Sequence, residues 1–186
     1  MNNALADEPV LIWSGKALLD GELSIGVDSA AIVVITAGPG NLHHAELCAR
    51  FFDNGIGTLT VDLLTDDERQ FDSRTRHIRF DVPFLADRIQ QVIAWLRHEP
   101  ATHDLPIFIF ATGSSIEAAL AAAAHRPKDV AGILTDTTEH HLREWPGTVP
   151  IFILDLETGP LGRQTSTAVR IAADWVHAHR RCAGFA

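Results

Sequence analysis

The stretch PIFIFATGSSIEAALAAAAHRP, residues 106–127, decides the fold of this chain. It begins with a short apolar run, which is typical of a strand covered on both faces of a parallel sheet. A tight glycine turn follows, and the alanine-rich segment after it favours a helix that packs closely on the sheet. Gly113 lies at the apex of this turn, where a strand-to-helix turn of this kind usually presents a reactive side chain.

Strand-like and helix-like patterns alternate along the rest of the chain. Further apolar runs cover residues 30–37, 57–64, 129–136 and 149–156, and helical patterns cover residues 44–52, 82–97, 114–125 and 165–180. The segment Val10 to Ile25, with Gly15 and Asp20-Gly21 as turn signals, predicts an antiparallel hairpin at one sheet edge. We therefore expect one α/β domain over residues 1–186, a three-layer, doubly wound and mostly parallel sheet whose ligands bind beyond the carboxyl ends of the strands.

Composition narrows the class of protein. The chain has 186 residues, 46% of them apolar, and a formal charge of −9 that leaves only short basic clusters, so we expect no nucleic-acid partner. Cys48 and Cys182 form no CxxC motif, which fits a reducing compartment. The N-terminus lacks the pattern of a signal peptide and no apolar run approaches a membrane span, so we expect a cytoplasmic protein with no membrane contact.

The polar segment from Thr65 to Phe80 lies between a predicted strand and a long predicted helix. It is either a lid over a site or a solvated connection, and we favour the connection because loops outside a core are polar in general.

Three segments carry a resemblance to a known family. GTLTVDLLTDDE (57–68), RFDVPFLADRIQQVIAWLR (79–97) and HRPKDVAGIL (125–134) resemble the dienelactone-hydrolase-like branch of the α/β-hydrolase superfamily in order and spacing. The resemblance covers roughly residues 10–154. It implies an eight-stranded, mostly parallel sheet with a serine nucleophile after the fifth strand, an acid after the seventh and a histidine after the eighth.

The nucleophile motif of that family, G-x-S-x-G, falls on residues 111–115 and places Gly113 at the nucleophile position. Taking Ser114 or Ser115 as the nucleophile instead places a bulky residue where close helix-to-sheet packing needs a small one. We expect Ser114 to cap the following helix in a capping box with Glu117. Gly113 also removes the steric cost of the positive φ that such a turn requires.

The acid and the histidine of the family are expected at the C-terminal end. Asp155 or Glu157 could supply the acid. Only eight residues, 157–164, separate the last predicted strand from the last helix, too few for a parallel crossover and another strand. We infer that the last strand and the histidine loop are missing, and that His177 and His179 are surface residues of the terminal helix.

The oxyanion side of the family site corresponds to the glycine turn at residues 36–41. Ala37 takes the place of the family's histidine, and Pro39 removes one N–H donor. A structural turn is the favoured interpretation, although the amides around Gly38 and Gly40 could still bind an anion. The turn matches neither the phosphate-loop nor the dinucleotide fingerprint, so we expect no nucleotide cofactor.

Histidines and carboxylates also gather after several strands. They are His43, His44, Asp62, Asp136, Glu139, His140, His141, Asp155 and Glu157. Adjacent histidines point in different directions on a helix or a strand, so they make poor metal ligands, and we expect neither a metal nor any other cofactor.

Two functions remain. In the first, a hydrolase-like scaffold without its nucleophile and histidine binds a small molecule in the crevice over Gly113, or assembles as a homo-oligomer or with a protein partner. In the second, the chain is an ester or lactone hydrolase that uses Ser114 or Ser115, with His140 or His43 as base and Asp155 as acid. We favour the first, because residues that act as a unit lose most of their effect when one is missing.

Overall fold

The computed structural model of the chain describes residues 7–36, 42–135, 147–154 and 163–180. Its strands are β1 (Asp7–Ser14), β2 (Ala17–Ser24), β3 (Ile32–Ile35), β4 (Gly57–Val61), β5 (Ile107–Phe110), β6 (Val130–Thr135) and β7 (Ile151–Ile153). Its helices are α1 (Leu42–Asp53), α2 (Asp66–Thr75), α3 (Val82–His98), α4 (Ser115–His125) and α5 (Arg163–His179), with a short 3-10 helix at Ile78–Phe80. Every strand and helix expected from the sequence is present, within a few residues of its expected bounds.

The described strands form one sheet in the order β1-β2-β4-β3-β5-β6-β7. Strands β3, β4, β5, β6 and β7 are parallel to one another, and β2 is antiparallel to both β1 and β4. Because β3, β4, β5 and β6 are central and covered on both faces, all of their residues are buried. The predicted mixed sheet with an N-terminal antiparallel hairpin is confirmed.

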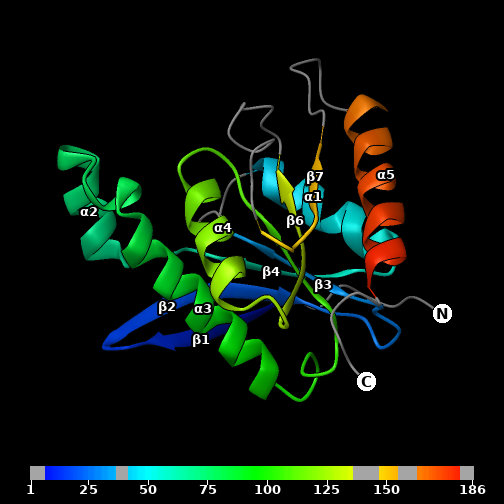
Figure 1. Ribbon diagram of the computed structural model, residues 1–186, viewed down its shortest axis with the longest axis horizontal. Coiled ribbons are helices and arrows are strands. Elements are labelled where there is room, and N and C mark those ends of the chain that lie inside the picture. The colour runs from blue at the N-terminus through cyan, green and yellow to red at the C-terminus, as the bar shows by residue number, and fades with distance from the viewer. Residues whose placement is uncertain (1–6, 37–41, 136–146, 155–162, 181–186) are drawn as a thin grey trace.

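Helices cover both faces of the sheet and make three layers (Figure 1). The apolar sides of α3 and α4 pack on one face, together with Ile32, Val34 and Ile109 from the strands. The apolar sides of α1 and α5 pack on the other face, with Val33, Ile35 and Phe108. Successive strand residues alternate between the two cores, as the twofold period of a strand requires.

Strand β3 lies between β4 and β5, the next two strands along the chain. The connection that leaves β3 leads to β4 on one side, whereas the connection that leaves β5 leads to β6 on the other side. Such a reversal leaves a crevice beyond the carboxyl ends of the two central strands, and ligands of open α/β sheets bind there. Thr36, directly after β3, and the turn after β5 lie at this end of the sheet.

The polar segment 65–80 is an ordered helical connection. Thr65 and Glu68 form a capping box at the start of α2, and the Glu68 carboxylate also pairs with the Arg88 guanidinium of α3 at 2.5 Å. Asp72 accepts hydrogen bonds from the Arg79 side chain and from the backbone N–H groups of Ile78 and Arg79. The segment that connects β4 to α3 therefore contains a helix that hydrophobic periodicity did not reveal.

Within the described ranges, helix α5 follows β7 in the chain and no eighth strand is present. None of the helices in this part of the chain is both long enough and apolar enough to cross a membrane.

Candidate functional site

The turn after β5 has the backbone geometry of a nucleophile elbow. Gly113 has a φ of +56°, in the left-handed region that side chains other than glycine rarely adopt. A Cβ atom added to Gly113 would have no heavy atom within 4 Å, so the space above this residue is open. The elbow therefore keeps its shape and its access to solvent while it presents no side chain at its apex.

Ser115 stabilises the elbow through the hydrogen bonds of its side chain. Its Oγ donates a hydrogen bond to the Thr112 carbonyl oxygen at 2.9 Å and accepts one from the Thr112 N–H at 3.2 Å. It also accepts a hydrogen bond from the Thr36 hydroxyl at 3.0 Å. A hydroxyl with its proton and both lone pairs engaged in this way is a structural link, and it is poorly placed to attack a substrate.

Ser114 differs from its neighbour. It is exposed, and its side chain makes no capping hydrogen bond to α4, so the capping box expected between Ser114 and Glu117 is wrong. The physical reason is the backbone: at φ −69° and ψ −13° Ser114 is already helical, whereas a capping residue needs extended geometry to reach the N–H groups that follow.

Thr36 brings the end of β3 to the elbow. Its backbone N–H donates to the Phe110 carbonyl oxygen at 3.1 Å, and its hydroxyl is shared between Phe110 O and Ser115 Oγ. The sequence placed Thr36 in the turn after a strand but gave no sign of this contact, because its partner lies 79 positions further along the chain. The parallel pairing of β3 with β5 is what places the two residues side by side.

Two backbone donors lie next to each other in the elbow, at Gly113 and Ser114. Among the residues that the structure describes, no acceptor pairs with the N–H groups of Gly113 and Ser114, whereas those of Ser115 and Ile116 bond to Thr112 and Gly113 carbonyl oxygens. The N–H of Ser114 follows the nucleophile position, which is the position of one oxyanion donor in a serine hydrolase. Free amides at the start of an eleven-residue helix suit a carboxylate or a polarised carbonyl oxygen.

The expected base and acid lie outside the residues that the structure describes. His140, Asp155, Gly38 and Gly40 are outside the described residues, as are Asp136, Glu139, His141 and Glu157, and the His43 and His44 side chains are not described either. Their roles stay predictions.

The histidines that are described make other contacts. His177 bonds to the Asn54 carbonyl oxygen through Nε2, and His179 stacks on Trp175 of its own helix. In the described part of the chain, no hydrogen bond links an imidazole to Ser114 or Ser115.

Two other reactive residue types can be placed. The Asp62 carboxylate at the end of β4 accepts a hydrogen bond from the Leu64 N–H and pairs with Arg69, so it holds the start of α2. Burial raises the pKa of the Cys48 thiol, which favours its protonated form. The described residues contain no group of three or more histidine, cysteine or acidic side chains that could hold a metal ion.

Comparison with known proteins gives one set of sequence relatives. Over 135 residues the chain is 32% identical to a Mycobacterium tuberculosis protein, present in two strains, whose name provisionally describes it as a phosphoribosyl transferase. The match covers 70% of this chain but only 30% of that protein. No protein-family model matches the chain.

Solved structures resemble the chain over nearly all of its length. A dienelactone hydrolase from Anabaena variabilis superposes with a TM-score of 0.81 at 22% identity, covering 95% of this chain and 99% of that one. A dienelactone-hydrolase-like promiscuous phosphotriesterase from metagenomic libraries gives a TM-score of 0.59 at 15% identity, covering 94% and 78%. At these identities the likeness concerns the fold.

Proposed function

We propose that this chain, which has the α/β-hydrolase fold in its dienelactone-hydrolase-like form, is a binding protein without serine-hydrolase activity. Its ligand is a small molecule with a carboxylate or lactone carbonyl, held in the crevice over Gly113. The observation that carries this proposal is the elbow itself: a glycine at φ +56° under open space, beside a Ser115 hydroxyl whose hydrogen bonds are all made.

The N–H groups of Gly113 and Ser114, which have no acceptor among the described residues, supply the polar contacts for such a ligand. In an active hydrolase the equivalent donor stabilises an oxyanion during reaction. Where no nucleophile stands beside it, the same donor stabilises a bound oxygen atom in the ground state. This is binding without the transition-state preference that catalysis needs.

A titration of the labelled protein with short-chain carboxylates and lactones tests the binding role. The amide resonances of Gly113 and Ser114 should shift in a saturable way. Ser114→Asp places a competing carboxylate at the helix start and should weaken the binding of carboxylates, whereas Ser114→Ala keeps both donors and should bind as the unchanged protein does. Equal binding by the two variants, or no shift at either amide, would contradict the proposal.

One observation favours a second function, an ester or lactone hydrolase. The Ser114 hydroxyl is exposed and is not engaged in capping α4, so it is available to react. Turnover of an ester panel that disappears in Ser114→Ala but persists in Glu117→Ala would establish this function in place of the binding role.

The transferase activity in the name of the Mycobacterium relative is not carried over to this chain, since most of that protein lies outside the matched segment. Self-association also stays a prediction. Light scattering over a dilution series tests it: a mass above that of one chain at every concentration supports an oligomer, and a monomer mass throughout excludes one.

A further inference from the structure

A pocket lies at the opposite end of the sheet from the elbow. It is a cavity of about 450 Å³ formed where α4 ends and β6 begins, and its lining residues are Gln90, His125, Arg126, Pro127, Lys128 and Asp129. This volume is in the range of small-molecule sites. Because α4 runs back from the carboxyl end of β5 to the amino end of β6, the pocket is separated from the crevice by the length of that helix.

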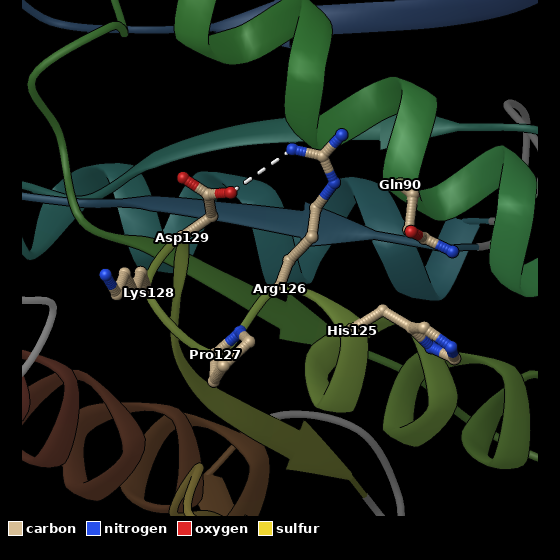
Figure 2. A pocket seen from close by; sticks show the side chains of 6 residues that line it. All are labelled: Gln90, His125, Arg126, Pro127, Lys128 and Asp129. Atoms are coloured by element: carbon tan, nitrogen blue, oxygen red, sulfur yellow. Dashed lines mark hydrogen bonds and ion pairs between the residues drawn. The ribbon is translucent and has the colours of Figure 1, made fainter.

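The Arg126 guanidinium is the central group of this pocket. Figure 2 shows it rising from the turn after α4 toward α3, with Asp129 on one side and Gln90 and His125 on the other. Its Nη1 donates to the Asp129 carboxylate at 3.2 Å. In the described part of the chain, its Nε is a buried side-chain nitrogen with no hydrogen-bond partner.

An unpaired buried donor is costly, and the cost is larger for a charged group. Asp129 uses one end of the guanidinium, which leaves the edge formed by Nε and Nη2. That edge carries two parallel N–H groups and matches the spacing of oxygens on a phosphate or carboxylate.

The charges around the pocket favour a dianion. Asp129 is its one lining carboxylate, and Arg97 of α3 already binds it, with Nε 3.4 Å from Oδ1 and Nη2 2.8 Å from the backbone oxygen. Of the charged residues that line the pocket, Arg126 and Lys128 exceed Asp129 by one positive charge, and Arg97 offsets the charge of Asp129 from behind. Lys128 is exposed and points away from Arg126 in Figure 2. Its long and flexible side chain therefore adds positive charge near the pocket rather than a fixed contact.

Gln90 completes the set of donors, and His125 lies beside it. The Nδ1 atom of His125 bonds to the Ala121 carbonyl oxygen at 2.7 Å, which makes Nδ1 the donor nitrogen and fixes the ring at the end of α4. Gln90 lies above it on α3 (Figure 2), and its amide can turn an N–H group toward the cavity. A phosphate has more oxygen acceptors than a carboxylate and therefore uses more of these groups.

From this arrangement we infer that the pocket binds the phosphate group of a small ligand, with the Nε and Nη2 edge of Arg126 as its main contact. The net charge of the chain, −9, opposes unspecific binding of anions, so phosphate affinity has to come from a local site of this kind. The pocket is independent of the function proposed for the crevice over Gly113.

The test is a titration with inorganic phosphate at constant ionic strength, followed through the backbone amides of His125, Arg126, Lys128 and Asp129. We expect saturable shifts at these amides and none at Gly113. Arg126→Ala should weaken binding by about tenfold or more, as the loss of a charged hydrogen-bond pair does. Arg126→Lys keeps the charge but loses the planar edge, so it should also bind more weakly.

Lys16→Ala is the matched control, because Lys16 is an exposed lysine in the turn between β1 and β2, far along the chain from the pocket. It should bind phosphate as the unchanged protein does. Glycerol 3-phosphate, titrated in parallel, separates two sources of the phosphate: tighter binding than inorganic phosphate indicates an organic ligand, and equal binding indicates the free ion. Absence of shifts at residues 125–129, or equal weakening by Arg126→Lys and Lys16→Ala, would overturn the inference.

Discussion

Two adjacent serines at the elbow have different roles although they look interchangeable in the sequence. Ser115 is tied to Thr112 and to Thr36, and Ser114 is exposed and makes no cap. The difference follows from the direction of each side chain on the first turn of α4. The Ser115 hydroxyl bonds to the backbone of the elbow, whereas the Ser114 hydroxyl makes no capping bond to α4.

Replacement of each serine by alanine measures this difference. Ser115→Ala leaves the Thr112 N–H without its acceptor and should lower the free energy of unfolding by roughly 1–3 kcal/mol. Ser114→Ala is the matched control and should change it by less than about 0.5 kcal/mol. Urea unfolding of both variants gives the answer, and a loss near 1 kcal/mol in Ser114→Ala would restore the capping role that we reject.

Substitution of Gly113 tests the backbone strain at the apex of the elbow. Gly113→Ala meets no steric obstacle, but it places a side chain at φ +56° and should cost roughly 1–2 kcal/mol of stability. The same substitution at Gly55, which has φ +71° and the same open surroundings, is the control for backbone strain alone and should cost a similar amount. A neutral Gly113→Ala would mean that the turn relaxes, and the elbow geometry would lose its significance.

Helix α2 shows how an element can be stable without an apolar stripe. Glu68 caps it and pairs with the buried Arg88, and Asp72 receives three hydrogen bonds at its far end. Burial alone would raise the pKa of Asp72, but the hydrogen bonds from Arg79 and from the Ile78 N–H outweigh it, so the pKa of Asp72 is lowered. The pKa of Glu68 is lowered in the same way, with Arg88 as the main partner against desolvation.

These lowered pKa values predict how the stability of the protein changes at acid pH. A carboxyl group with a lowered pKa in the folded state adds stability above its unfolded pKa and loses that contribution as the pH falls through the folded value. We expect the stability of the protein to fall below about pH 5, since unfolded aspartate and glutamate titrate near 4. Asp72→Asn should flatten this decline, and Asp67→Asn, at an exposed position of the same helix, should leave it unchanged. Equal acid profiles for Asp72→Asn and the unchanged protein would contradict the assignment.

Strand β6 and helix α5 depend on close contact at a glycine. A Cβ atom added to Gly132 would lie 2.5 Å from Cη2 of Trp175 and 3.0 Å from Cδ1 of Phe108. Trp175 in turn packs edge-on against Phe108, with 5.7 Å between ring centroids. A glycine is therefore required for α5 to lie this close to the sheet.

Gly132→Ala should lower the stability by roughly 1–3 kcal/mol through overpacking. Trp175→Phe removes the ring atoms nearest to the new methyl group, so the double variant should be less destabilised than the sum of the two single changes. Additive effects in this double-mutant cycle would show that the two residues do not meet.

At the scale of the whole molecule, the buried strands and the amphipathic helices were predictable because their burial dictates their patterns. The runs IVVI and IFIF are apolar throughout since both faces of their strands are covered. Helix α2 was missed because its stability comes from charged contacts with distant residues. The signal for it was local all the same: Thr65-Asp-Asp-Glu68 is a capping-box sequence with an acidic first turn.

The elbow was predictable in position but only partly in chemistry. The glycine at its apex and the alanine-rich helix after it are visible in the sequence, and the positive φ follows from them. The Thr36–Ser115 hydrogen bond was not predictable, since it depends on the register between β3 and β5. The roles expected of His140 and Asp155 fall outside the described residues and stay predictions.

The central claim is that no serine at the elbow acts as a nucleophile, and covalent labelling tests it most directly. The intact protein is treated with a fluorophosphonate probe and its mass and modified peptides are measured, with Ser114→Ala and Ser115→Ala alongside. We expect no stoichiometric adduct on the peptide that carries residues 114 and 115. One equivalent of probe on that peptide, lost in one of the two variants, would contradict the account.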